Sequence, residues 1–152
     1  MSEAPTVKNE IYISAVQNAL FTFQMIEEAL KICIMASYEI LARSAPPPVV
    51  FSFDTVAITN SPLGQLIKTF SRVSANSILI KELKSIEEWR NFCAHRAYTH
   101  EFLKRGTSEA VSQSDIDDLQ KVKAAGVKLV EQLGDEMVAI RAAHAKLHNA
   151  AN

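Results

Sequence analysis

Side chains that can do chemistry recur within nine residues of the chain, at Arg90, Asn91, His95 and Tyr98. An imidazole can take or give a proton near neutral pH. A guanidinium stays charged and can donate two parallel hydrogen bonds to a phosphoryl group. Asn91 precedes His95 by one helical turn, so its amide can orient the imidazole or hold a phosphate oxygen. These groups fit phosphoryl transfer assisted by proton transfer.

The segment around these residues has two faces when it is drawn as a helix. Asn91, His95, Tyr98 and Phe102 follow one another at spacings of four, three and four residues. The other face is apolar, as in a helix that packs on a core, and comprises Leu79, Leu83, Ile86, Cys93 and Ala97. Arg90 falls within this apolar face, where a charged side chain is out of place. Such a break in a local pattern indicates a functional site.

The segment Arg90-Asn91-Phe92-Cys93-Ala94-His95 resembles the R-N-x-x-x-H form of the Arg-x4-6-His motif of the HEPN superfamily. These are small all-helical domains, and many are ribonucleases of toxin-antitoxin, phage-defence and RNA-processing systems. The resemblance implies an endoribonuclease that needs neither a metal nor another cofactor. In such an enzyme His95 would act as the acid and base, Arg90 would bind the phosphate, and Asn91 would orient the imidazole. It also implies a homodimer, in which two copies of the motif form one composite site.

Cleavage of this kind uses the 2′-OH of RNA as the nucleophile, so DNA would not be cleaved. A base takes the hydroxyl proton, an acid protonates the leaving 5′-oxygen, and a cation stabilises the charge that develops at phosphorus. One histidine does not readily fill both proton-transfer roles, which is why the second copy of His95 matters. The alternative is a noncatalytic HEPN-like module that binds RNA or a nucleotide, or assembles a larger complex, through the same groove.

The partners implied by the resemblance include an antitoxin or a nucleotidyltransferase. Some HEPN toxins resemble R-x4-H-x-Y, where the partner modifies a tyrosine two residues after the histidine. Tyr98 follows His95 by three residues, so packing at an interface is the favoured role for its ring. Phe102 is the predicted interface residue beside it.

The net charge of −1 and the pI of about 6.4 mean that any attraction to phosphates must come from a local patch. The predicted RNA contacts are Lys84, Arg96, Lys104 and Arg105. Lys104 and Arg105 could equally serve the C-terminal end of their helix, where the helix dipole favours cations.

A long helix is predicted from about Lys8 to Arg43. Its apolar stripe has one seven-residue gap and consists of Ile13, Val16, Leu20, Phe23, Leu30, Ile34, Tyr38 and Leu41. Glu27 falls in the gap. Two interpretations stay open: Glu27 is buried and supports the site by pairing with Arg90, or it lies at the solvent edge with its carboxylate outward.

Local signals predict the remaining elements. Pro46-Pro47-Pro48 ends the first helix and leads into an extended connector, whose aromatic rings lie on the helices. A helix is predicted to start at Asn60-Ser61-Pro62. The motif helix is predicted over 77–104, with Gly106 as its C-cap. A capping box at Ser114-x-x-Asp117 starts the last helix, which runs to about His148.

These elements predict an all-α fold and a single domain over 1–152 with flexible tails at about 1–8 and 149–152, and the resemblance implies that this domain is HEPN-like. It is a bundle of about four main helices, the long ones antiparallel. No apolar run reaches the roughly 18 residues that a membrane span needs. Cys33 and Cys93 lie in apolar runs, as reduced core cysteines of a cytoplasmic protein do.

Overall fold

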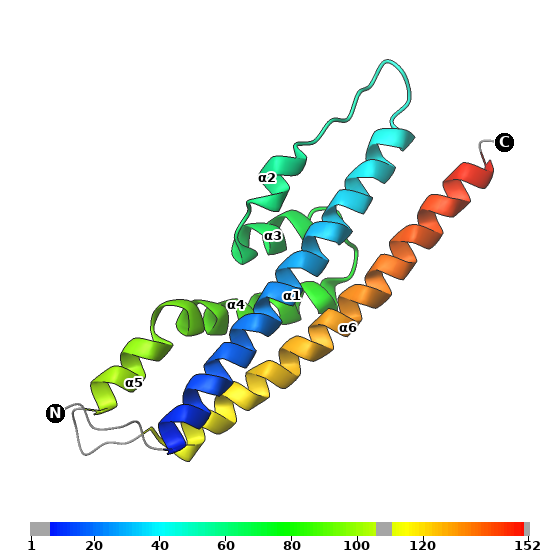
Figure 1. Cartoon of the computed structure of the whole chain (residues 1–152). Helices are drawn as coiled ribbons and strands as arrows, with labels where there is room; N and C mark the ends of the chain where they lie inside the picture. Colours follow the sequence, from blue (N-terminus) through cyan, green and yellow to red (C-terminus); the bar gives the residue numbers. More distant parts are fainter. Residues whose placement is uncertain (1–6, 106–110, 151–152) are drawn as a thin grey trace. The chain divides into compact units, whose positions relative to one another are not determined.

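The computed structural model describes residues 7–105 and 111–150, and that part of the chain contains helices and no strand (Figure 1). The helices are α1 (Val7–Ser44), α2 (Thr55–Thr59), α3 (Leu63–Phe70), α4 (Ser77–His95), α5 (Ala97–Arg105) and α6 (Gln113–Ala150). The all-α prediction is confirmed. The first described helix begins at Val7 and the last ends at Ala150. In the described ranges, no helix combines the length and apolarity of a membrane span.

The contacts within the chain form two compact units. Unit 1 comprises Met1–Gln24 and Ser85–Lys128, and unit 2 comprises Met25–Lys84 and Leu129–Asn152. The helices α1, α4 and α6 each contribute a segment to both units. The Arg90–His95 motif belongs to unit 1. The single domain over 1–152 stays a prediction.

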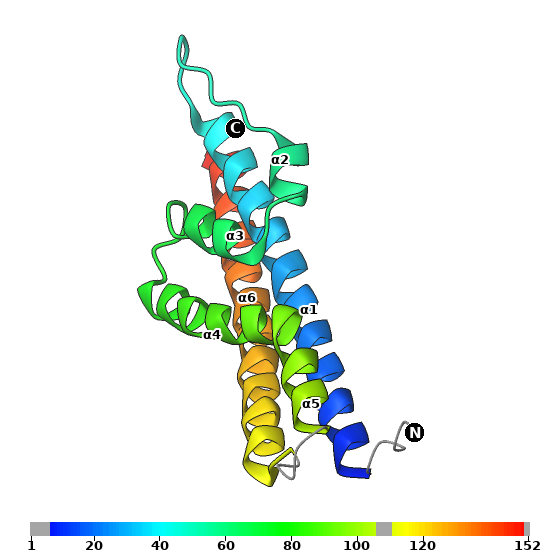
Figure 2. The same ribbon diagram turned by 90° about the vertical axis from the view of Figure 1, so that its left-hand side faces the viewer.

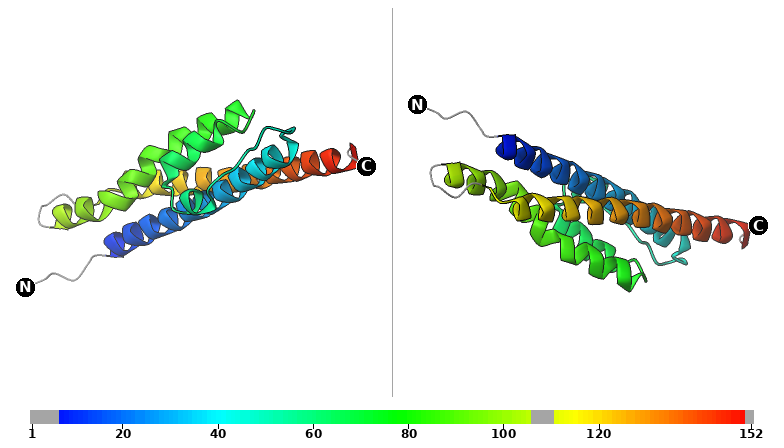
Figure 3. Two further views of the ribbon diagram at one scale, coloured as in Figure 1. Left: turned by 90° about the horizontal axis from the view of Figure 1, so that it is seen from above. Right: turned by 90° about the horizontal axis from the view of Figure 1, so that it is seen from below.

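Within each unit, α1 and α6 run in the same direction (Figure 3). In unit 2 the Cys33 thiol donates to the Leu133 carbonyl over 3.6 Å, and Arg43 Nη1 lies 2.9 Å from His144 Nε2. Residues ten apart on one helix thus meet residues eleven apart on the other, in the same order, as only parallel helices allow. The predicted antiparallel arrangement was therefore wrong. Up-and-down packing requires a short direct loop, whereas α2 to α5 come between these helices.

The connector of unit 2 begins with a turn at Pro47 and Pro48, so the predicted extended conformation of these prolines was wrong, and the residues that follow are extended, as predicted (Figure 2). Its rings lie on α1. The ring centroids of Phe51 and Phe53 lie 5.4 Å and 5.3 Å from that of Tyr38. The short helix α2 was missed; Asp54 caps it by accepting hydrogen bonds from the Val56 and Ala57 amides.

The start of α3 lies one residue later than predicted. Pro62, predicted as the first helical residue, is the N-cap of α3 with no side-chain capping bond, and Asn60 is the C-cap of α2. A polar residue before a proline can close one helix as well as open the next, so this local signal was ambiguous.

The buried stripe of α1 differs from the predicted one at its gap. Ile26 is fully buried there, whereas Glu27 is half-buried and Glu28 exposed. An ideal helix drifts relative to a fixed seven-residue spacing, so the buried position moved to the residue before Glu27. The pairing of Glu27 with Arg90 stays a prediction.

A capping box starts α6, two residues earlier than predicted. Ser112 Oγ accepts a hydrogen bond from the Asp115 amide (3.1 Å), and Asp115 Oδ2 accepts one from the Ser112 amide (2.9 Å). Val111 and Ile116, at the two positions that form a hydrophobic staple, are both buried. Ser114 and Asp117 fit the same pattern in the sequence. The pair of Ser112 and Asp115 forms the capping box because the residues that flank it, Val111 and Ile116, are both buried. This cap fixes Asp115 in unit 1.

Candidate functional site

The motif lies where the chain changes direction. The helix α4 ends at His95 and α5 begins at Ala97, with Arg96 in a turn between them, so the predicted continuous helix over 77–104 was wrong (Figure 2). The buried Tyr12 hydroxyl donates to the Ala97 carbonyl over 3.2 Å and fixes the start of α5 on α1. Because Tyr12 and Ala97 are 85 residues apart, no sequence pattern around Ala97 indicated this contact. The predicted C-cap, Gly106, lies outside the described residues.

The three predicted catalytic residues all lie on the last turns of α4. The side chains of Asn91 and His95 are exposed and one turn apart, as the spacing predicted. Arg90 is half-buried. Helical geometry places Arg90 and His95 about 140° apart around the axis of α4. The two side chains therefore leave α4 in different directions.

The aromatic residues predicted beside the motif lie on α5. Tyr98 and Phe102 are one turn apart and expose 42% and 71% of their surface, and Leu103 next to them is exposed as well. Because the helix is interrupted at Arg96, these rings do not continue the face of Asn91 and His95. The predicted single stripe is thus divided into a polar face on α4 and an apolar face on α5.

The predicted RNA contacts have different surroundings. The Arg96 side chain is exposed, and its guanidinium lies 5.7 Å from the centroid of the Phe92 ring. Lys104 donates to Asp115 Oδ2 over 3.2 Å. Lys84 is exposed and belongs to unit 2, whereas the side chain of Arg105 lies outside the described residues.

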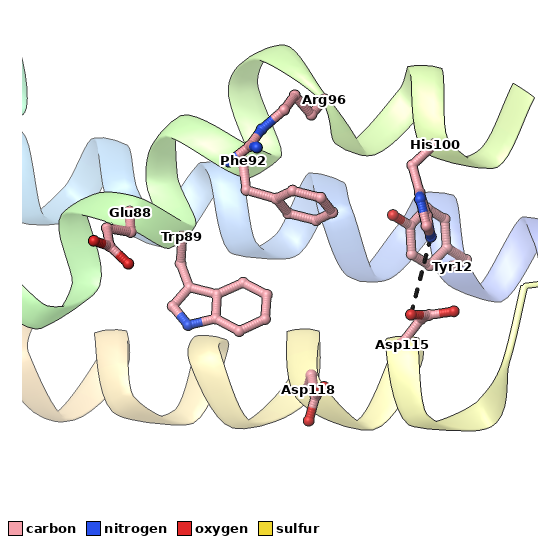
Figure 4. Close-up of a pocket in the computed structure, with 8 residues that line it drawn as sticks. All are labelled: Tyr12, Glu88, Trp89, Phe92, Arg96, His100, Asp115 and Asp118. Atoms are coloured by element: carbon pink, nitrogen blue, oxygen red, sulfur yellow. Dashed lines mark ion pairs between the residues drawn. The ribbon is translucent and has the colours of Figure 1, made fainter. Parts of the chain in front are cut away.

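A pocket of about 390 Å³ lies in unit 1 next to the turn at Arg96 (Figure 4). We call it the ring pocket. Its lining residues come from α1, α4, α5, α6 and the turn: Tyr12, Glu88, Trp89, Phe92, Arg96, His100, Asp115 and Asp118. Only Arg96 among them was predicted as a site residue.

Four rings follow one another through the ring pocket (Figure 4). The centroid distances are 5.9 Å from Trp89 to Phe92, 6.2 Å from Phe92 to His100, and 6.4 Å from His100 to Tyr12. Trp89, Phe92, Arg96 and His100 recur at spacings of three, four and four residues. This periodicity was visible in the sequence and could have indicated the pocket, whereas Tyr12 and Asp115 are brought in by tertiary packing.

The carboxylate of Asp115 has several defined partners. Its Oδ2 accepts hydrogen bonds from Lys104 and from the amide and hydroxyl of Ser112, and its Oδ1 faces His100 Nε2 across 4.0 Å. Desolvation alone would raise the pKa of this carboxyl. The hydrogen bonds from Ser112 and the charge of Lys104 outweigh it, so the pKa of Asp115 lies below its ordinary value. The pocket therefore holds a carboxylate at neutral pH.

Tyr12 closes the far end of the ring pocket and is only 1% exposed. Burial, followed by the charges of Asp115, Cys93 and Glu101, raises the pKa of its phenol to about 12. The phenol therefore stays protonated at neutral pH and acts as a hydrogen-bond donor. Burial likewise raises the pKa of the Cys93 thiol to about 11, which excludes this thiol as a nucleophile near neutral pH.

The free energy of unfolding should fall as the pH rises from about 10 to about 12. In this window the unfolded chain releases the Tyr12 proton and the folded chain keeps it, so deprotonation favours unfolding. A difference of two pKa units corresponds to roughly 2–3 kcal/mol over the window. Urea denaturation of the wild type and Tyr12→Phe from pH 8 upward would measure the effect. The variant should lose this part of the pH dependence, and identical slopes for both proteins would contradict it.

The motif and the ring pocket together bring an imidazole, a guanidinium and a series of aromatic rings to one end of α4. Comparisons with protein-family models, with curated proteins and with solved structures gave no match to this chain.

Proposed function

We propose that the chain is a metal-independent endoribonuclease of the HEPN type, a cytoplasmic member of a toxin-antitoxin or phage-defence system. The observation that carries the proposal is the exposure of Asn91 and His95 on one face at the end of α4, in an all-helical chain. Neither side chain is needed to fill the core. An exposed amide and imidazole one turn apart are available to a substrate, as the R-N-x-x-x-H resemblance requires.

The cleavage would begin when one His95 takes the proton of the RNA 2′-OH, which then attacks the adjacent phosphorus. The P–O5′ bond breaks, and the His95 of a second copy gives a proton to the leaving 5′-oxygen. Arg90 stabilises the charge on the phosphoryl oxygens, and Asn91 orients the imidazole or holds one of these oxygens. The products are a 2′,3′-cyclic phosphate and a 5′-hydroxyl.

Two features support a homodimer. Arg90 and His95 lie about 140° apart around α4, so a site that contains both groups is more easily built from two chains. The exposed apolar face of α5, formed by Tyr98, Phe102 and Leu103, offers a surface for self-association. An antitoxin, or a nucleotidyltransferase acting on Tyr98, would be the regulator of such a toxin.

Incubation with RNA in excess EDTA should leave cleavage unchanged, because the side chains supply every group that the reaction needs. The products should carry 2′,3′-cyclic phosphate ends, and DNA of the same sequence should stay intact. End-group analysis by mass spectrometry would measure both results. Cleavage that stops in EDTA and returns with Mg²⁺ would contradict the proposed mechanism.

The second candidate function is RNA or nucleotide binding without cleavage. The observation that favours it is the ring pocket, whose aromatic rings and guanidinium can bind a base and a phosphate without performing any chemistry. The two functions are separated by whether bound RNA is recovered intact from the wild-type protein in the experiment above.

A further inference from the structure

We propose that the ring pocket binds one nucleobase of single-stranded RNA, and that it prefers bases with an exocyclic amino group. This inference deepens the proposed function, since it adds a specificity site to the RNA-cleaving motif. The pocket shares none of its lining residues with the predicted catalytic set of Arg90, Asn91 and His95.

The geometry of the rings carries the first step. Trp89 meets Phe92 at an interplanar angle of 86°, and Phe92 meets His100 at 66°. Because these rings meet edge to face, neither pair covers its own faces by parallel stacking. All three side chains are half-buried, so part of each remains accessible from the pocket. A planar base can stack on such a surface, which every nucleobase does with aromatic side chains.

The charges of the lining residues carry the second step. Glu88, Asp115 and Asp118 are the acidic residues of the lining, and Asp118 Oδ1 also lies 3.5 Å from Lys121 Nζ. The Oδ1 of Asp115 is directed toward His100, while its Oδ2 is occupied by Ser112 and Lys104. Ionised carboxylates only accept hydrogen bonds. Adenine, cytosine and guanine present an exocyclic amino group as donor, whereas the single N3–H donor of uracil is flanked by two carbonyl oxygens that the carboxylates repel.

The position of Arg96 carries the third step. Its guanidinium lies over the Phe92 ring at 5.7 Å, and the side chain is exposed. A positively charged ligand would be attracted by the carboxylates but repelled by Arg96 at this ring. A phosphate would be repelled by the carboxylates but attracted by Arg96. A nucleotide therefore fits with its base among the rings and its phosphate at Arg96, the residue directly after His95.

Trp89 is the only tryptophan of the chain, so its fluorescence reports on the ring pocket. We would titrate the full-length His95→Ala protein, which should leave RNA intact, with eight-nucleotide oligo(A), oligo(C) and oligo(U). Oligo(A) and oligo(C) should change the fluorescence saturably, with dissociation constants about tenfold below that of oligo(U), the effect of one favourable hydrogen bond.

Three substitutions, made in the same His95→Ala protein, test the separate parts of the argument. Phe92→Leu removes a stacking ring and Arg96→Gln removes the phosphate contact, so each should weaken binding of all oligonucleotides about tenfold. Asp118→Asn should weaken the preference for oligo(A) over oligo(U). Arg72→Gln, at an exposed arginine of unit 2, is the matched control and should change nothing. Circular dichroism would verify that the variants are folded.

Equal affinity for the three oligonucleotides, or binding insensitive to both Phe92→Leu and Arg96→Gln, would overturn the proposal. A fluorescence response to tetramethylammonium but not to RNA would identify a cation cage and overturn it as well. Cleavage by the wild type without any Trp89 response would reject the base pocket and leave the ribonuclease proposal intact. Base-selective binding without cleavage would support the pocket and reject the catalytic function.

Discussion

His95→Ala should lower the rate of RNA cleavage by roughly 10²- to 10⁴-fold, the usual contribution of general acid–base catalysis. The ring is exposed at the last residue of α4, so its removal takes little packing away and should leave the helix content unchanged. Because two copies of His95 share the proton transfers in the proposed site, the substitution removes the acid and the base together. Single-turnover cleavage of a labelled RNA and far-ultraviolet circular dichroism would measure the two effects.

The matched control is His144→Ala, on α6 in unit 2, where the histidine lies near Arg43 and outside the proposed site. It should cleave at the wild-type rate. His100→Ala provides a second comparison, because His100 lines the ring pocket. Cleavage lost in His100→Ala and kept in His95→Ala would move the catalytic role from the motif to the pocket.

Local patterns predicted the elements that depend on neighbouring residues. The predicted first helix, from about Lys8 to Arg43, agrees with α1 to within one residue at each end. The three prolines prevent α1 from continuing, and Pro47 and Pro48 form a turn before the extended residues of the connector. In both cases the deciding interactions lie within a few positions of the chain, so a single sequence contains them.

Features that depend on tertiary packing were not predictable in the same way. The break at Arg96 depends on Tyr12, which is distant in sequence and bonds to the Ala97 carbonyl. The burial of Ile26 instead of Glu27 depends on the rotation of a long helix against its neighbours. The ring pocket joins residues from both ends of the chain, such as Tyr12 and Asp115. In each case the outcome depends on which residue of another helix a side chain contacts. The sequence pattern of one helix does not specify that contact.

Phe102→Glu should weaken self-association and reduce RNA cleavage in parallel. Phe102 exposes 71% of its surface on α5, beside Tyr98 and Leu103, and an aromatic side chain on such a face is a candidate interface anchor. Loss of a well-packed aromatic anchor costs about 2 kcal/mol or more, or roughly 30-fold in the dissociation constant. A twofold symmetric dimer contains the substitution twice, so the two new carboxylates add to the loss. A single chain holds one His95 and one Arg90, which is half of the proposed site.

The measurement is sedimentation equilibrium of the wild type and the variant, with specific activity followed over the same dilution series. Val138→Glu is the matched control, because Val138 is 67% exposed on α6 in unit 2 and receives the same change from apolar to charged. It should leave both association and cleavage unchanged, since the proposed interface is the face of α5. In the wild type, specific activity should fall on dilution at the concentration where dimers dissociate. A wild-type monomer with full activity at every dilution would rule out the composite site, because one chain would then supply both the acid and the base.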